Sequence, residues 1–190
     1  MSSVPKSRRK PHDFQTPTKL HKIRELITEL AVNDFGYDKE RLEEKIKRFE
    51  QSMTNIEPER KAAIVAKMRW KNESFFTKFV EKETDTLLDL ARWAVFEFEM
   101  GNSIFPTGLS RVAEFRERRK HLDAAIGWLH CMKQELQYIA ETLPGDKNRY
   151  VPLSDEIEVL IDMVKGVRRS ANRFLKKDSG QTKQNRKTDD

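Results

Sequence analysis

Apolar residues recur at helical spacing along most of the chain, and the clearest series lies between Phe115 and Leu143. One set of apolar residues returns every seventh position and a second set follows it by three: Phe115, Leu122, Leu129, Leu136 and Leu143, then Ala125, Met132 and Ile139. A repeat sustained over four heptads is typical of a bundle helix or a coiled coil. The spacing predicts one long helix that begins near Ser110 and ends before Pro144-Gly145.

The same three-and-four spacing predicts further helices on both sides of this one. Their approximate ranges are 16–33, 38–53, 58–100 and 154–177. Asp38 is the expected cap of the second, and Pro58 stands at the expected first position of the third. In the long stretch after Pro58, the polar run at 71–74 is the candidate break.

These elements predict an all-α protein, an up-down four-helix bundle domain over residues 16–177 with a helical insertion at 37–72. Only seven glycines and seven prolines occur among the 190 residues, which favours long helices over a many-turned β fold. Residues 1–15 lack apolar periodicity and are predicted to form a flexible basic arm. Residues 178–190 are polar and are predicted to form a disordered tail.

Two basic clusters stand out in this chain of formal charge +6. The first consists of Arg116, Arg118, Arg119 and Lys120. Helices joined by a short loop pack antiparallel, so the start of the Ser110 helix should lie beside the end of the last helix. That end carries the second cluster: Lys165, Arg168, Arg169, Arg173, Lys176 and Lys177. The two clusters are therefore expected to converge at one end of the bundle.

Two interpretations of this convergence stay open. Like charges brought together are unfavourable unless an anion offsets them, so the surface is a candidate phosphate-binding site. Alternatively, carboxylates within the fold neutralise the cluster, and the candidates are Glu97, Glu99, Glu114 and Glu117.

The sequence offers no catalytic grouping. There is no glycine-rich phosphate loop, the four histidines are scattered, and neither a metal site nor a cofactor is expected. Cys131 is expected in the core, and Trp70, Trp93 and Trp128 are expected to be packing anchors, with a subunit interface as the alternative for Trp128. No stretch looks long and apolar enough to cross a membrane, and a cytoplasmic protein is expected.

The second half of the chain also resembles a known family. The helix EFRERRKHLDAAIGWLHCMKQELQYI, a short loop and the helix LSDEIEVLIDMVKGVRRSANRFLKK look like the last two helices of a four-helix-bundle family. That family joins ribosomal intervening-sequence proteins to Avd, the accessory protein of diversity-generating retroelements. DTLLDLARWAVFEFEMGNSIFP would then correspond to the second bundle helix and its exit loop, so that the resemblance covers roughly residues 75–177.

The resemblance implies a homopentamer whose basic surface binds the element's reverse transcriptase and its template RNA. The polymerase supplies the catalysis in such a complex. Carried over to this chain, the RNA or polymerase contacts would be Arg116, Arg118, Arg119 and Lys120, with Arg168, Arg169 and Arg173 beside them. The insertion at 37–72 and the charged tails depart from the family pattern. The alternative function is a helical-bundle adaptor, like the intervening-sequence proteins, that mediates protein–protein interaction without binding RNA.

Overall fold

The computed structural model describes residues 15–106, 110–143 and 146–184, with side chains described as far as Ala171. Within these ranges the regular structure is helical and contains no β-strand. The α-helices are α1 (Gln15–Val32), α2 (Lys39–Ser52), α3 (Pro58–Phe75), α4 (Glu81–Ser103), α5 (Arg111–Thr142) and α6 (Val151–Gln184). The predicted all-α class is confirmed.

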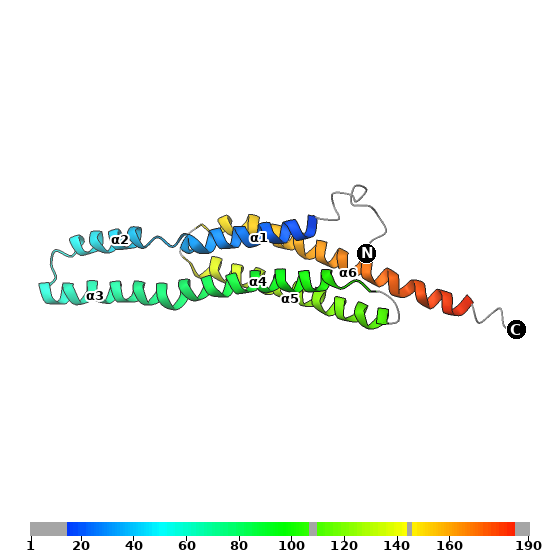
Figure 1. Cartoon of the computed structure of the whole chain (residues 1–190). Helices are drawn as coiled ribbons and strands as arrows, with labels where there is room; N and C mark the ends of the chain where they lie inside the picture. Colours follow the sequence, from blue (N-terminus) through cyan, green and yellow to red (C-terminus); the bar gives the residue numbers. More distant parts are fainter. Residues whose placement is uncertain (1–14, 107–109, 144–145, 185–190) are drawn as a thin grey trace.

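Four of these helices pack side by side around one core. α4 lies against α1 and α5, and α6 lies against α5 and α1, with neighbouring helices running in opposite directions (Figure 1). Every residue of the predicted heptad series in α5 is buried, from Phe115 to Leu143. It meets buried side chains from the other three helices, among them Ile27, Phe98 and Leu160. The periodicity therefore identified the buried face of α5 correctly.

The predicted helical insertion is a hairpin of α2 and α3 that projects beyond the ends of α1, α5 and α6 (Figure 1). Its two helices bury a small separate cluster of Ile46, Met53 and Val65. Asp38 caps α2 as expected, because its side chain accepts a hydrogen bond of 2.8 Å from the backbone N–H of Arg41. Phe49 of α2 is exposed, since a two-helix hairpin covers only a narrow strip of each helix.

α3 and α4 form one continuous rod, joined by a π-helical segment at Phe76–Val80 (Figure 1). The irregularity therefore lies just after the polar run at 71–74, where a break was predicted. Such segments insert extra residues into a turn and shift the face that the following helix presents. At this point aromatic rings gather, with Phe75 stacked on Phe79 at 5.1 Å and Tyr138 of α5 against Phe79 at 5.5 Å.

The chain leaves α1 through a tight turn at Asp34–Gly36, where three consecutive residues have positive φ. Phe35 is buried in this turn, and its carbonyl accepts a hydrogen bond of 2.9 Å from the hydroxyl of Tyr150. Gly36 has φ +71°, and the guanidinium of Arg149 occupies the space that a Cβ would need. Left-handed backbone is costly for residues other than glycine, so burial and the tyrosine contact hold the turn in place.

The backbone of α6 continues as helix to Gln184. It therefore passes Asp178, where the sequence pattern predicted the beginning of a disordered tail. No proline follows Pro152 in the chain, so no residue after it lacks the N–H that the next helical turn requires. Of the predicted basic arm, only Gln15 falls within the described residues, and it begins α1.

Candidate functional site

The two basic clusters meet on one carboxylate. Asp123 of α5 accepts a hydrogen bond from Nη1 of Arg168 in α6, and its other oxygen lies 3.5 Å from Nε of Arg119, one turn earlier in α5. Farther along the same antiparallel pair, Lys133 of α5 binds Glu158 of α6 at 2.6 Å. The expected convergence of the α5 and α6 clusters is thus confirmed.

Arg118 is turned inward rather than toward this surface. Its Nη1 donates a hydrogen bond of 2.8 Å to the carbonyl oxygen of Ile104, just past the end of α4. Carbonyl groups at a helix C-terminus lack partners within the helix, and a cation there also complements the helix dipole. Burial lowers the pKa of Arg118, in keeping with its half-buried position. Arg118 therefore links the C-terminal end of α4 to α5.

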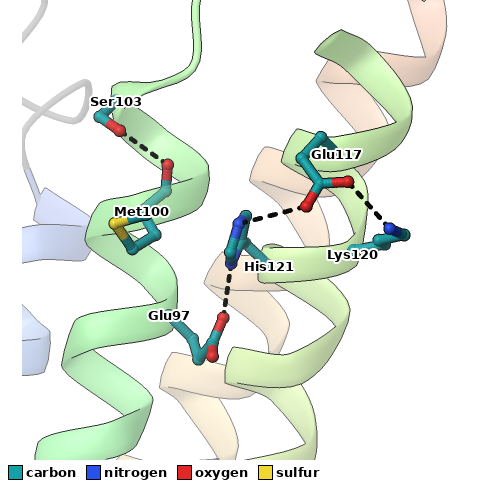
Figure 2. Close-up of polar contacts among 6 residues, drawn as sticks. All are labelled: Glu97, Met100, Ser103, Glu117, Lys120 and His121. Atoms are coloured by element: carbon teal, nitrogen blue, oxygen red, sulfur yellow. Dashed lines mark hydrogen bonds and ion pairs between the residues drawn. The ribbon is translucent and has the colours of Figure 1, made fainter. Parts of the chain in front are cut away.

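Lys120 belongs to a chain of charges that links α5 to α4 (Figure 2). It binds Glu117 at 2.9 Å, and this contact holds the pKa of the Glu117 carboxyl below its ordinary value. His121 lies between two carboxylates, 2.7 Å from Glu97 of α4 and 3.7 Å from Glu117 (Figure 2). Lys120 is therefore neutralised within the fold, by Glu117.

The α6 cluster is only partly neutralised. Lys165 lies 3.4 Å from Asp162 of its own helix, and Arg168 is bound to Asp123. Arg169 is exposed, and its Nε donates to the backbone carbonyl of Lys165 at 3.4 Å rather than to a carboxylate. The side chains of three further candidates lie outside the described residues: Arg173, Lys176 and Lys177.

Arg116 also lacks a carboxylate partner in the described part of the chain. It is exposed, and none of the described side chains forms an ion pair with it. Arg116 precedes Arg119 by three residues, so the two lie on the same side of α5. We use the name α5–α6 basic surface for the open or shared cations of this region: Arg116, Arg119, Lys165, Arg168 and Arg169.

Some of the carboxylates that neutralise the clusters were expected and others were not. Glu117 acts as predicted, and Glu97 is engaged with His121. Glu114 accepts a hydrogen bond of 2.6 Å from Ser110. Glu99 is exposed, and it has no ion pair with any described side chain. Asp123 and Asp162 were missed, although both stand three or four residues from a basic residue of the surface, at the spacing where helical side chains meet.

Three further expectations were wrong. Cys131 is exposed, because it lies one position off the buried series that contains Met132. Trp70 and Trp93 are exposed rather than packed in the core, while Trp128 packs against the core cluster. Hydrophobicity alone does not tell whether a neighbouring element covers a given apolar residue.

Over 15–106, 110–143 and 146–171, where side chains are described, no three histidine, cysteine or acidic side chains are grouped so that they could hold a metal ion. None of the helices in those ranges has the length and apolar character needed to cross a bilayer.

Comparison of the chain with protein-family models, with curated proteins and with solved structures gives no match in any of the three.

Proposed function

We propose that this protein is a non-catalytic accessory protein that binds a retroelement reverse transcriptase and its template RNA through the α5–α6 basic surface. In this proposal α1, α4, α5 and α6 form an up-down four-helix bundle like that of the Avd family. The observation that supports RNA binding most strongly is the convergence of arginines from two helices on Asp123, with Arg116 and Arg169 left open beside them.

The charge of this surface favours a polyanion. Among the described residues, its five cations form ion pairs with two carboxylates, those of Asp123 and Asp162, which leaves a local excess of about three positive charges. Cations held on rigid helices and exposed to solvent attract phosphates by charge, release the counterions of the nucleic acid and read little of its sequence. A surface of this kind suits a template RNA that must be held without regard to its bases.

The proposal of a reverse transcriptase as the partner is based on the resemblance of α4, α5 and α6 to the Avd family. The protein would then supply scaffold and charge in the cytoplasm, while the polymerase carries out the reaction. A gene for a reverse transcriptase next to the gene for this protein, together with a repeated variable region, would support this part of the proposal. Neighbouring genes of unrelated kinds would speak against it.

The test is the double variant Arg116→Gln/Arg169→Gln, measured for binding to single-stranded RNA and to the polymerase. Each lost phosphate contact removes about 0.7 logarithmic units of affinity at about 0.1 M salt, so the double variant should bind RNA about 25-fold more weakly. Helicity should be unchanged, because both side chains are exposed.

The matched control is Arg41→Gln/Arg60→Gln, which removes the same charge from exposed positions on the α2–α3 hairpin. We expect wild-type affinity from this control. If both double variants bind RNA as the wild type does, the surface is not the RNA site. The adaptor function, with an acidic protein as partner, would then be the better explanation.

A further inference from the structure

The outward face of α4 carries three large apolar side chains close together. Trp93, Phe96 and Met100 are 45%, 48% and 40% exposed. Their spacing of three and four residues places them on one side of the helix. The other side is the one that packs into the core, through buried residues that include Leu87, Ala91, Ala94, Val95 and Phe98.

The three side chains form one patch rather than separate exposed residues. The rings of Trp93 and Phe96 meet edge to face, with centroids 5.7 Å apart, and Met100 follows one turn after Phe96. Single exposed apolar residues are common on protein surfaces, but an adjoining group that includes a tryptophan is typical of a contact surface. We call Trp93, Phe96 and Met100 the α4 apolar stripe.

We infer that the α4 apolar stripe binds a second copy of this chain, with the two α4 helices antiparallel about a two-fold axis. The charges beside the stripe favour a second copy of the chain as the partner. Arg92 and Glu99 are seven residues apart, so both lie along the same edge of the stripe. A two-fold axis reverses the second helix and brings Arg92 of each copy opposite Glu99 of the other, so that the pair forms twice.

Both charges are available for such contacts. Glu99 is exposed and has no ion pair within the described part of the chain. Arg92 binds Asp89 of its own helix at 2.9 Å, and both side chains are largely exposed, so this pair stabilises the monomer little and can be exchanged.

The charges also select the register and the direction. In the register that pairs Arg92 with Glu99, Trp93 of one copy lies on Phe96 of the other. A shift of the second helix by one heptad would place Glu99 opposite Glu99, which is unfavourable. A parallel arrangement would pair Arg92 with Glu97, but Glu97 is directed toward α5, where it binds His121 at 2.7 Å (Figure 2).

The stripe is short, so the dimer should be weak. Stable interfaces bury about 1,200–2,000 Å² in total, and three side chains on each copy provide less apolar contact than such interfaces contain. We therefore expect a dissociation constant in the range of about 1–100 μM. The stripe shares no residue with the α5–α6 basic surface, so the dimer does not depend on RNA binding. It also differs from the pentamer that the family resemblance implies.

The first experiment measures the mass of the full-length chain by sedimentation velocity and light scattering across this concentration range. The wild type should pass from monomer to dimer. Trp93→Ala/Phe96→Ala should remain monomeric with unchanged helicity. The control Trp70→Ala removes another exposed tryptophan, on α3, and should dimerise as the wild type does.

The second experiment tests the charge pair. Arg92→Glu and Glu99→Arg should each raise the dissociation constant of the dimer at least about tenfold, because each change replaces two attractive pairs with two repulsive ones. The double variant Arg92→Glu/Glu99→Arg should restore wild-type dimerisation, since the swapped charges again face each other. RNA affinity per chain should stay the same in all three variants.

Two results would overturn the inference. One is a wild type that stays monomeric over the whole range, which would show that the stripe does not bind a second copy. The other is an assembly, of any size, whose stability does not respond to the charge reversals and their combination.

Discussion

Replacing Asp123 with asparagine should move stability and RNA affinity in opposite directions. Asp123 is the carboxylate that Arg119 and Arg168 share, and it is 43% exposed on its side chain. Asparagine keeps the shape and one acceptor oxygen but removes the charge. The two arginines then lose their common counterion and become available to phosphate.

The size of both effects follows from the geometry. Each exposed ion pair contributes about 0.2–1 kcal/mol, so the loss of two pairs should lower the free energy of unfolding by about 1 kcal/mol. Removing a negative charge about 7 Å from a bound phosphate, in a water-like dielectric, favours binding by about 0.6 kcal/mol. RNA affinity should therefore rise about threefold.

The assay combines chemical denaturation with fluorescence anisotropy on labelled single-stranded RNA at fixed salt. The control Glu44→Gln removes a carboxylate that lies 3.5 Å from Arg48 on the α2–α3 hairpin, and it should leave RNA affinity unchanged. If Asp123→Asn binds RNA more weakly, or as tightly as the wild type, phosphate does not approach these arginines and the reasoning is refuted.

Three further predictions concern stability. Burial, and then the neighbouring Glu135, raise the pKa of Glu83 above 4.5, and one oxygen of Glu83 is buried without a partner among the described groups. Folding therefore favours the protonated carboxyl, and this contribution to the free energy of unfolding is present below about pH 4.5 and is lost as pH rises through the raised pKa. Glu83→Gln should abolish that loss and should melt at a higher temperature than the wild type at pH 7. If the melting temperature of the variant depends on pH as that of the wild type does, the prediction is contradicted. Tyr150→Phe should lower the free energy of unfolding by about 1–3 kcal/mol in denaturant titrations, because it leaves the buried carbonyl of Phe35 unpaired, and a loss near zero would show that water replaces the hydroxyl. Gly36→Ala should cost about 1 kcal/mol or more in the same titration because of its φ of +71°, whereas a stabilised variant would mean that this turn adopts another conformation.

Much of the helical framework could be predicted because burial in a helix leaves a periodic trace. The heptad series of α5, from Phe115 to Leu143, is buried throughout. The convergence of the two basic clusters was also predictable, because a short connection forces α5 and α6 to pack antiparallel. Asp123 and Arg168 meet as that connection requires.

The sequence was less informative about which apolar side chains are covered by neighbouring helices. Trp93 was expected in the core, yet Ala94 and Phe98 fill the core side of α4 and leave Trp93 on the outward side with Phe96 and Met100. A second apolar stripe at the same three-and-four spacing was the available signal, and composition alone does not separate a buried stripe from an exposed one.

The sequence also did not predict the direction in which each basic side chain points. Arg118 turns toward the carbonyl of Ile104, while Arg119, the next residue, reaches Asp123. That difference depends on where α4 ends relative to α5, which is a tertiary property. The basic run at 116–120 therefore serves both structure and surface.

The central claim is that the α5–α6 basic surface binds RNA through phosphates, and the salt dependence of RNA affinity tests it most directly. If each of the five cations of this surface engages a phosphate, the logarithm of the affinity of the wild type should fall against the logarithm of salt concentration with a slope of about −3.5. In Arg116→Gln/Arg169→Gln the slope should become shallower by about 1.4. A wild-type slope near zero, or a slope that the double variant leaves unchanged, would contradict the account.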